Sequence, residues 1–353
     1  MLQENKTAES QEFLKRAAKF DPKLLLRSIA IYIQNGQANQ AKATADMLVE
    51  RVSVKDKKGD DAEDRVVLAA QAYALTNRID NALEVLQSGL RQMPQSPKLL
   101  RALSDAFRYK FRLSFVRSGK NVQVNLELLN AAIALDPTNI AIQEDLNACK
   151  QLGIGSTDSN IELLRVQIAT SGTSFVARLI LADSSFRRGD LASAINDYEV
   201  VLAELPQMTL ALNNLAMLHA SSVPPKLDES LKLIDRAIEI SPTVSEFHDS
   251  RGDILVLLKR REDAVTSYLQ ALESTPQRIQ TREKLIGLYE ELSQADQAQV
   301  QRDKLAEIQK AMEEQRLNTE AALEQQKQLT KSEKPTELET QPQEEPAAAK
   351  EPE

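Results

Sequence analysis

The chain has 353 residues, of which 42% are hydrophobic, 27% are charged and only 4% are aromatic, so it can bury a large core and is rich in strong helix formers. Its net charge of −8 argues against general binding to nucleic acid or to an anionic membrane. The single cysteine, Cys149, excludes an intramolecular disulfide and any cysteine-based zinc cage.

The first 21 residues lack the apolar core of a signal peptide, and no stretch of the chain approaches 18 uninterrupted apolar residues. We therefore expect a soluble, cytoplasmic protein with no membrane span in this chain. The segment from Ala8 to Phe20 has the pattern of the second helix of a helical hairpin, with no first helix before it. Two interpretations stay open: residues 1–21 are an N-terminal cap or partial repeat helix, or the true chain begins upstream with further repeats or a membrane anchor.

Between residues 22 and 305 the helix breakers recur at a regular distance. Steps of 43, 35, 34, 36 and 34 residues separate Pro94, Pro137, Gly172, Pro206, Pro242 and Pro276. Amphipathic helical patterns lie before and after most of these breakers. The spacing therefore predicts an array of helical hairpins with a period near 34 residues. The polar stretch 54–61 lengthens one connection and is expected to be a solvated loop.

One copy of the hairpin pattern is especially clear. Helix axes approach to about 8–10 Å only where the contact positions carry small side chains, and an aromatic ring then fills the groove between hairpins. A proline after the second helix separates it from the next hairpin, because proline lacks the N–H and clashes with the preceding turn. These positions are held by Gly252, Ala264, Tyr268, Ala271 and Pro276.

This pattern resembles the tetratricopeptide-repeat family, and in-phase copies recur along the chain. The copies are carried by Tyr32, Gly36 and Ala41; by Ala70, Tyr73, Ala82 and Pro94; by Ala182, Gly189, Ala194, Tyr198 and Pro206; and by Ala216, Ala237 and Pro242. Two weaker copies end at Pro137 and Gly172. An irregular helical bundle would have no reason to keep this phase. The resemblance implies an all-α, right-handed superhelical solenoid of about eight hairpins over residues 22–305.

A basic and aromatic insertion spans residues 98–120, with Lys98, Arg101, Arg108, Lys110, Arg112, Arg117 and Lys120 among Tyr109, Phe111 and Phe115. Such a mixture is able to receive an acidic peptide, a phosphate group or single-stranded RNA. The alternative is an elongated hairpin whose aromatic rings pack inward while the cations stay in water.

Apolar residues become sparse towards the C-terminus. Residues 306–330 are predicted to form an exposed helical extension that covers the last hairpin, without the sustained heptads of a coiled coil. Residues 331–353 carry prolines and glutamates with little apolar surface, and they are predicted to be a disordered acidic tail.

The sequence contains no recognisable catalytic, cofactor-binding or metal-binding motif. Its only histidines are His219 and His248, and both occupy positions where the repeat places packing aromatics. A helical solenoid with enzymatic activity would have to use the neighbourhood of His248, Asp249 and Asp253. We expect a chain that is not an enzyme and that needs no cofactor or metal.

The resemblance implies a scaffold that binds a peptide or partner helix in a concave groove lined by the first helix of each hairpin. An amide both donates and accepts hydrogen bonds, so asparagines in such a groove suit a peptide backbone. The groove is expected to run from a basic end near Arg101 to an acidic end near Asp249, while RNA or phosphate binding through residues 98–120 stays an alternative. The candidate groove residues are Lys98, Arg101, Asp105, Arg108, Leu179, Asp183, Asn213, Asn214, Met217, Asp249 and Asp253.

Overall fold

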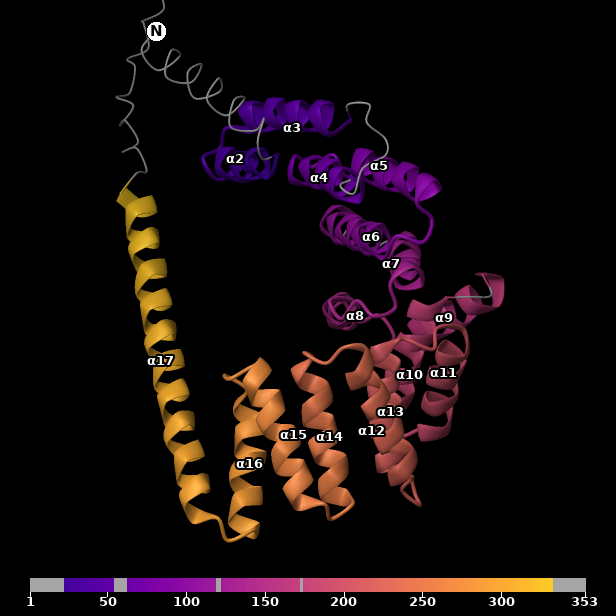
Figure 1. The fold of residues 1–353 in the computed structure, drawn as a ribbon, viewed down its shortest axis with the longest axis vertical. Helices are drawn as coiled ribbons and strands as arrows, with labels where there is room; N and C mark the ends of the chain where they lie inside the picture. Colours follow the sequence, from indigo (N-terminus) through magenta and orange to yellow (C-terminus); the bar gives the residue numbers. More distant parts are fainter. Residues whose placement is uncertain (1–21, 54–61, 119–121, 172–173, 333–353) are drawn as a thin grey trace, which may run out of the picture. The chain divides into compact units, whose positions relative to one another are not determined.

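The structure is a computed structural model, and it describes residues 22–53, 62–118, 122–171 and 174–332. Every regular element in these ranges is an α-helix (Figure 1). The predicted cap at residues 1–21, the predicted loop at 54–61 and the tail from residue 333 onward lie outside the described residues. Within the described ranges, no helix combines the length and the apolar character that crossing a membrane requires.

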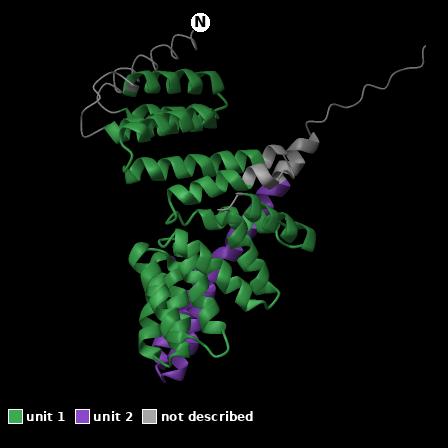
Figure 2. Cartoon of the chain, turned by 90° about the vertical axis from the view of Figure 1, so that its right-hand side faces the viewer, with its two compact units in different colours: residues 1–274 green, residues 275–353 purple. Residues whose placement is uncertain are grey.

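The chain divides into two compact units between residues 274 and 275 (Figure 2). The second unit holds α16 (Ile279–Glu291) and α17 (Ala295–Ser332). The helices of the first unit are α2 (Lys23–Gln34), α3 (Ala38–Ser53), α4 (Ala62–Leu75), α5 (Ile79–Gln92), α6 (Pro97–Ser118), α7 (Val122–Leu135), α8 (Ile142–Gln151), α9 (Asp158–Ser171), α10 (Phe175–Arg187), α11 (Leu191–Glu204), α12 (Thr209–Ser221), α13 (Leu227–Ile240), α14 (Ser245–Leu257) and α15 (Arg261–Ser274).

The helices of the first unit pack mainly as consecutive pairs. The pairs are α2 with α3, α4 with α5, α6 with α7, α10 with α11, α12 with α13, and α14 with α15. In most places the second helix of a pair also packs against the first helix of the next pair. The hairpins therefore stack in chain order, which confirms the predicted all-α repeat fold.

A residue with left-handed backbone geometry joins the two helices of most hairpins. Gly36 and Gly189 hold φ values of 72° and 80° in two of these turns, while Asn77 and Lys259 hold 58° and 61° in two others. Glycine adopts this geometry without strain, whereas a side chain beyond Asn or Asp rarely does. What these turns share is the left-handed backbone conformation. Residues other than glycine adopt it at Asn77 and Lys259, so glycine is not found in every interhelical turn.

The close helix contact predicted around Gly252 is present between α14 and α15. Ala264 and Ala271 are fully buried, and the ring of Tyr268 lies against the Gly252 backbone with only 2% of its surface exposed. A Cβ atom on Gly252 would lie 2.6 Å from Cδ1 of Tyr268. The small residues therefore let the two helices approach while the tyrosine fills the remaining space.

The pairing is least regular at α8 and α9, where the sequence pattern was weakest. The short helix α8 packs against α6, α7 and α10, while α9 packs against α10. A large core cluster that includes Phe111, Leu146, Cys149, Ile161 and Ile180 fills this region. Burial raises the pKa of the Cys149 thiol to about 12, so this thiol is an apolar packing group.

In the second unit α17 is much longer than its partner. Helix α16 has 13 residues and packs against α17, which has 38 and would extend about 57 Å. The side chains of residues 309–324 are all exposed, which confirms the predicted helical extension. The divisions predicted at residues 305 and 330 both fall inside α17.

Candidate functional site

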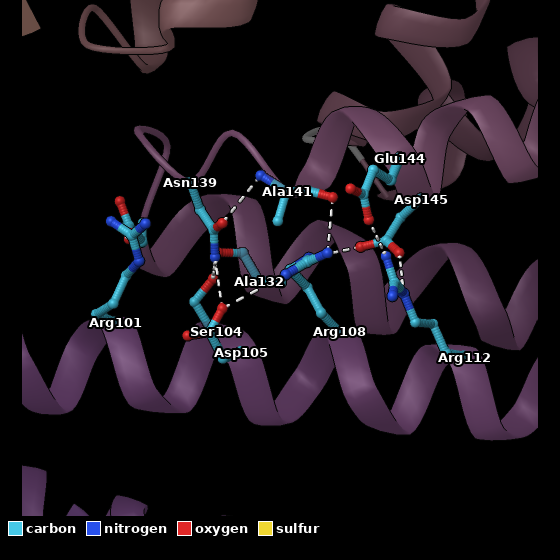
Figure 3. Close-up of polar contacts among 11 residues, drawn as sticks. Arg101, Ser104, Asp105, Arg108, Arg112, Ala132, Asn139, Ala141, Glu144 and Asp145 are labelled. Atoms are coloured by element: carbon cyan, nitrogen blue, oxygen red, sulfur yellow. Dashed lines mark hydrogen bonds and ion pairs between the residues drawn. The ribbon is translucent and has the colours of Figure 1, made fainter. Parts of the chain in front are cut away.

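Four of the candidate groove residues, Lys98, Arg101, Asp105 and Arg108, lie on α6. The last three are one turn apart, so they share one face of the helix with Arg112. The connection between α7 and α8 and the first turn of α8 lie along this face (Figure 3). Each of these residues contacts a side chain or carbonyl of a neighbouring element.

A buried carboxylate holds the centre of this contact. Asp145 is 1% exposed and accepts one hydrogen bond from Arg108 Nε at 2.5 Å and another from Arg112 Nε at 2.6 Å (Figure 3). Arg108 is also buried and donates from Nη2 to the Ala141 carbonyl at 2.6 Å. Arg112 donates to Glu144 at 2.8 Å, and its guanidinium holds the pKa of that carboxyl below its usual range. Two cations therefore compensate the buried charge of Asp145.

Further hydrogen bonds and one ion pair extend the contact toward the start of α6. Ser104 Oγ donates to the Ala132 carbonyl at 2.8 Å, and Asn139 Nδ2 donates to Asp105 Oδ1 at 2.8 Å (Figure 3). Arg101 pairs with Asp136 at 2.9 Å. We call this set, from Arg101 to Arg112 with its partners on the α7–α8 segment, the α6 seam. It fastens α6 to the segment that follows it.

The described cations of the insertion 98–120 are therefore paired. Lys98 pairs with Asp64, and Lys110 pairs with Asp80 at 2.7 Å. Phe111 packs inward with 1% of its surface exposed, as the elongated-hairpin interpretation expected. That interpretation was wrong about Arg108, which is buried rather than in water, because Asp145 of α8 supplies its counter-charge. The side chains of Phe115, Arg117 and Lys120 lie outside the described ones.

These pairings have no direct sign in the sequence, because the partners are far apart in the chain. The ion pairs that join α6 to the elements around it connect residues separated by 30 to 37 positions, which is about one repeat. A search for opposite charges at the repeat distance is the signal that could have found them. The expected basic end of the groove near Arg101 is consequently neutralised by carboxylates of adjacent elements.

Two further candidates lie on α10. Leu179 is 3% exposed and belongs to the core cluster around α8 to α11, so its side chain faces other helices and not solvent. Asp183 is half-buried between Lys150 of α8 at 3.0 Å and Arg187 at 3.3 Å. Both side chains therefore contact other residues of the repeat array.

The asparagines of α12 form a short hydrogen-bonded chain. Asn214 Nδ2 donates to the hydroxyl of Tyr198 at 2.9 Å, and Asn213 Nδ2 donates to Asn214 Oδ1 at 3.1 Å. Within the described part of the protein, Asn213 Oδ1 has no hydrogen-bond partner. Met217 lies one turn further along α12 and is half-buried. This helix therefore presents an amide and a thioether that are partly accessible.

Two half-buried aspartates occupy the matching positions of α14, which contacts α12. Asp249 and Asp253 lie 36 residues after Asn213 and Met217, the same step that separates the prolines of these two repeats. Asp253 Oδ1 accepts a hydrogen bond from Tyr268 at 2.7 Å. We call Asn213, Met217, Asp249 and Asp253 the α12–α14 face. Equivalent repeat positions place them on corresponding faces of adjoining first helices.

The two histidines are buried, as the packing interpretation expected. His219 is 5% exposed and burial lowers its pKa, while His248 is 7% exposed with Nε2 at 2.7 Å from the Pro242 carbonyl. Among the residues that the structure describes, no cluster of three histidine, cysteine or carboxylate side chains is placed to hold a metal ion. The surroundings of His248 are thus those of a packed side chain.

Comparison with known proteins supports the repeat assignment. Residues 143–288 match the tetratricopeptide repeat-like domain. No curated protein matches the sequence. This match agrees with the resemblance seen in the sequence.

Several solved structures show partial similarity to this chain. A mutant O-GlcNAc transferase from Thermobaculum terrenum is 26% identical over 33% of this chain and 22% of its own, with a TM-score of 0.31. MamA from Desulfovibrio magneticus RS-1 is 12% identical over 50% of this chain and 97% of its own, with a TM-score of 0.42. A tetratricopeptide repeat protein from Parabacteroides merdae is 15% identical over 75% of this chain and 97% of its own, with a TM-score of 0.36. This chain thus spans about a fifth of the transferase.

Proposed function

We propose that this chain is a non-catalytic scaffold for protein–protein interaction, and that it binds a peptide or partner helix across the α12–α14 face. The coarser part of this proposal rests on the tetratricopeptide repeat-like domain, which in other proteins is a module for binding proteins. The finer part rests on one observation. Matching positions of two adjoining first helices carry half-buried polar and thioether groups.

The chemistry of this face favours a basic segment. Asn213 offers a half-buried amide whose oxygen is buried and has no partner in the described part. Once the amide rotates toward solvent, this oxygen accepts a peptide N–H. Met217 offers a flexible apolar contact that adapts to different side chains. Asp249 and Asp253 add negative charge beside them, so lysine or arginine on the partner would be attracted. This revises the expectation of a groove that runs from a basic to an acidic end, because the cations at its basic end are already paired.

Nucleic-acid or phosphate binding through residues 98–120 has less support. Lys98, Arg101, Arg108, Lys110 and Arg112 each pair with a carboxylate in the structure. Binding a phosphate there would require breaking such a pair and leaving a carboxylate without its counter-charge. A catalytic role for Asp253 also lacks support, because Oδ1 of this carboxylate accepts a hydrogen bond from the phenol of Tyr268.

The proposal is tested by comparing two folded variants in affinity capture from native lysate. Asn213→Lys combined with Asp249→Lys reverses the charge of the face, and Glu262→Lys combined with Gln270→Lys on α15 adds the same charge at exposed positions elsewhere. We expect a protein that the unmodified chain retains to be lost at least tenfold from the first variant and kept by the second. Circular dichroism and melting temperature establish that both variants are folded.

Equal retention by both variants would remove the α12–α14 face from the proposal. Retention that disappears on nuclease treatment would instead point to RNA. The arginines of the α6 seam are unsuitable probes, since Arg108 is buried and its substitution would perturb folding before it perturbed binding.

A further inference from the structure

A second, separate surface feature lies where α9, α10 and α11 meet. A pocket of about 490 Å³ opens there, and it is lined by residues from all three helices. Its apolar lining includes Ile168 and Leu181, and its polar lining includes Arg165, Arg178, Asn196 and Asp197. This volume lies within the range of sites that take a small ligand or a few side chains.

The charges in the pocket are not balanced. Arg178 Nη1 donates to Asp197 Oδ1 at 3.2 Å, and the two side chains are only 21% and 15% exposed. This is the only side-chain hydrogen bond of Arg178 within the described residues, so most of its guanidinium donors are left over. Arg165 contributes a second guanidinium, 67% exposed and no closer than 3.8 Å to the carboxylate of Glu162. Two arginines thus accompany one carboxylate in the lining.

The Arg178–Asp197 pair gives the pocket a fixed polar wall. Burial raises the pKa of the Asp197 carboxyl even though Arg178 is adjacent. A half-buried guanidinium with spare donors is the group that binds a carboxylate in two-pronged geometry. An incoming carboxylate would bridge Arg178 and Arg165, and it would leave the existing pair intact.

The apolar lining decides what else the ligand must carry. Ile168 and Leu181 lie beside the arginines, so an aliphatic group next to the carboxylate would be covered. The pocket is open, because the lining residues Arg165, Ala192, Ser193 and Asn196 are exposed. An open pocket covers less of a free small molecule than enclosed ligand sites do, whereas a protein segment also makes contacts outside it. Leu163 and Val166 of α9 add exposed aliphatic surface at 55% and 49%.

We propose that this pocket is a docking site for a partner protein, and that it receives a segment in which an acidic residue stands beside an aliphatic one. The carboxylate binds Arg165 and Arg178, and the aliphatic side chain lies on Ile168 and Leu181. This site does not depend on the α12–α14 face, whose carboxylates favour a partner of the opposite charge. The two surfaces would let the scaffold hold two different segments.

The test follows the methyl signals of Ile168 and Leu181 by NMR in the full chain, titrated with acetyl-Leu-Glu-Leu-amide. The uncharged peptide acetyl-Leu-Gln-Leu-amide and free 4-methylpentanoate are titrated in parallel. We expect saturable shifts with the acidic peptide and at least tenfold weaker binding of the other two compounds. Arg165→Glu, at an exposed position, should weaken the acidic peptide at least tenfold, whereas Arg236→Glu on α13 makes the same charge change outside the pocket and should leave it unchanged.

Four results would overturn the proposal. Equal binding of the glutamine peptide would mean that the carboxylate is not recognised. Unchanged binding by Arg165→Glu, or no shift at millimolar peptide, would mean that the pocket is not the site. Binding of 4-methylpentanoate as tight as that of the peptide would make this a site for small carboxylates and not a docking site.

Discussion

A single glycine decides how closely α14 and α15 approach. The Gly252 position has no room for a side chain, since an added Cβ would lie 2.6 Å from Cδ1 and 2.8 Å from Cζ of Tyr268. The atoms it would meet belong to a rigid, buried ring and not to a flexible side-chain end. The constraint is therefore steric and not conformational, in contrast to the glycines of the interhelical turns.

We predict that Gly252→Ala destabilises the protein by about 1–3 kcal/mol through overpacking. Gly287 in α16 is the matched control, because a Cβ there would meet no atom within 4 Å. Gly287→Ala should instead stabilise the helix by about 0.5–1 kcal/mol, as alanine loses less backbone entropy than glycine. Urea unfolding of both variants checks the pair. Similar effects of the two substitutions would show that Tyr268 moves aside freely.

At the scale of elements, the α6 seam fastens one hairpin to the next through a buried carboxylate. Asp145 is shared by Arg108, which is 10% exposed at its side chain, and Arg112, which is 49% exposed. Removing one partner of a buried pair leaves the other charge without compensation, whereas an exposed pair contributes little. The two arginines should therefore contribute unequally to the free energy of unfolding, although they bind the same carboxylate.

We predict that Arg108→Ala lowers the free energy of unfolding by about 3 kcal/mol. Arg112→Ala should cost no more than about 1 kcal/mol. A double-mutant cycle with Asp145→Asn, followed by chemical denaturation, measures the coupling of each arginine to the carboxylate. Equal coupling for the two arginines would contradict the assignment of Arg108 as the buried anchor.

The sequence was sufficient to predict the helical hairpins, but it was insufficient to predict the contacts of the α6 seam. Small residues and prolines such as Gly252, Ala264 and Pro276 specify a helix pair locally, so their spacing predicts the fold wherever they are present. The α8–α9 region lacks these residues, and only the distance between Pro137 and Pro206 indicated repeats there. A cation such as Arg108 carries no local sign of its partner, because Asp145 is brought to it by packing between hairpins. Ion pairs between adjacent helices therefore determine which of the candidate groove residues remain accessible to a ligand.

On the scale of the whole molecule, buried tyrosines in different hairpins link stability to alkaline pH. Burial raises the pKa of Tyr198, and burial together with the hydrogen bond to Asp253 raises the pKa of Tyr268. Tyrosine ionises near pH 10 in an unfolded chain. Above that pH the unfolded state therefore releases protons that the folded state keeps, so the folded state loses stability as the pH rises.

We predict that the free energy of unfolding falls above pH 10, by as much as about 1.4 kcal/mol per pH unit for each such tyrosine. Tyr268→Phe should lose about 1 kcal/mol at pH 8 with its hydrogen bond and then decline less steeply above pH 10. Tyr109→Phe, at a position that is 40% exposed, should leave the steepness unchanged. Urea titrations between pH 8 and pH 11 measure these slopes, and identical slopes for all three chains would contradict the prediction.

The ion pairs that join residues one repeat apart make the hairpins unlike one another. Asp64 meets Lys98, Asp80 meets Lys110, and Asp158 meets Arg188, each across a distance of 30 to 34 positions. A hairpin moved to another place in the array would lose these partners. Because each pair is exposed and contributes little stability by itself, exchanging two hairpins there should cost less than removing the buried Asp145 contact of the α6 seam.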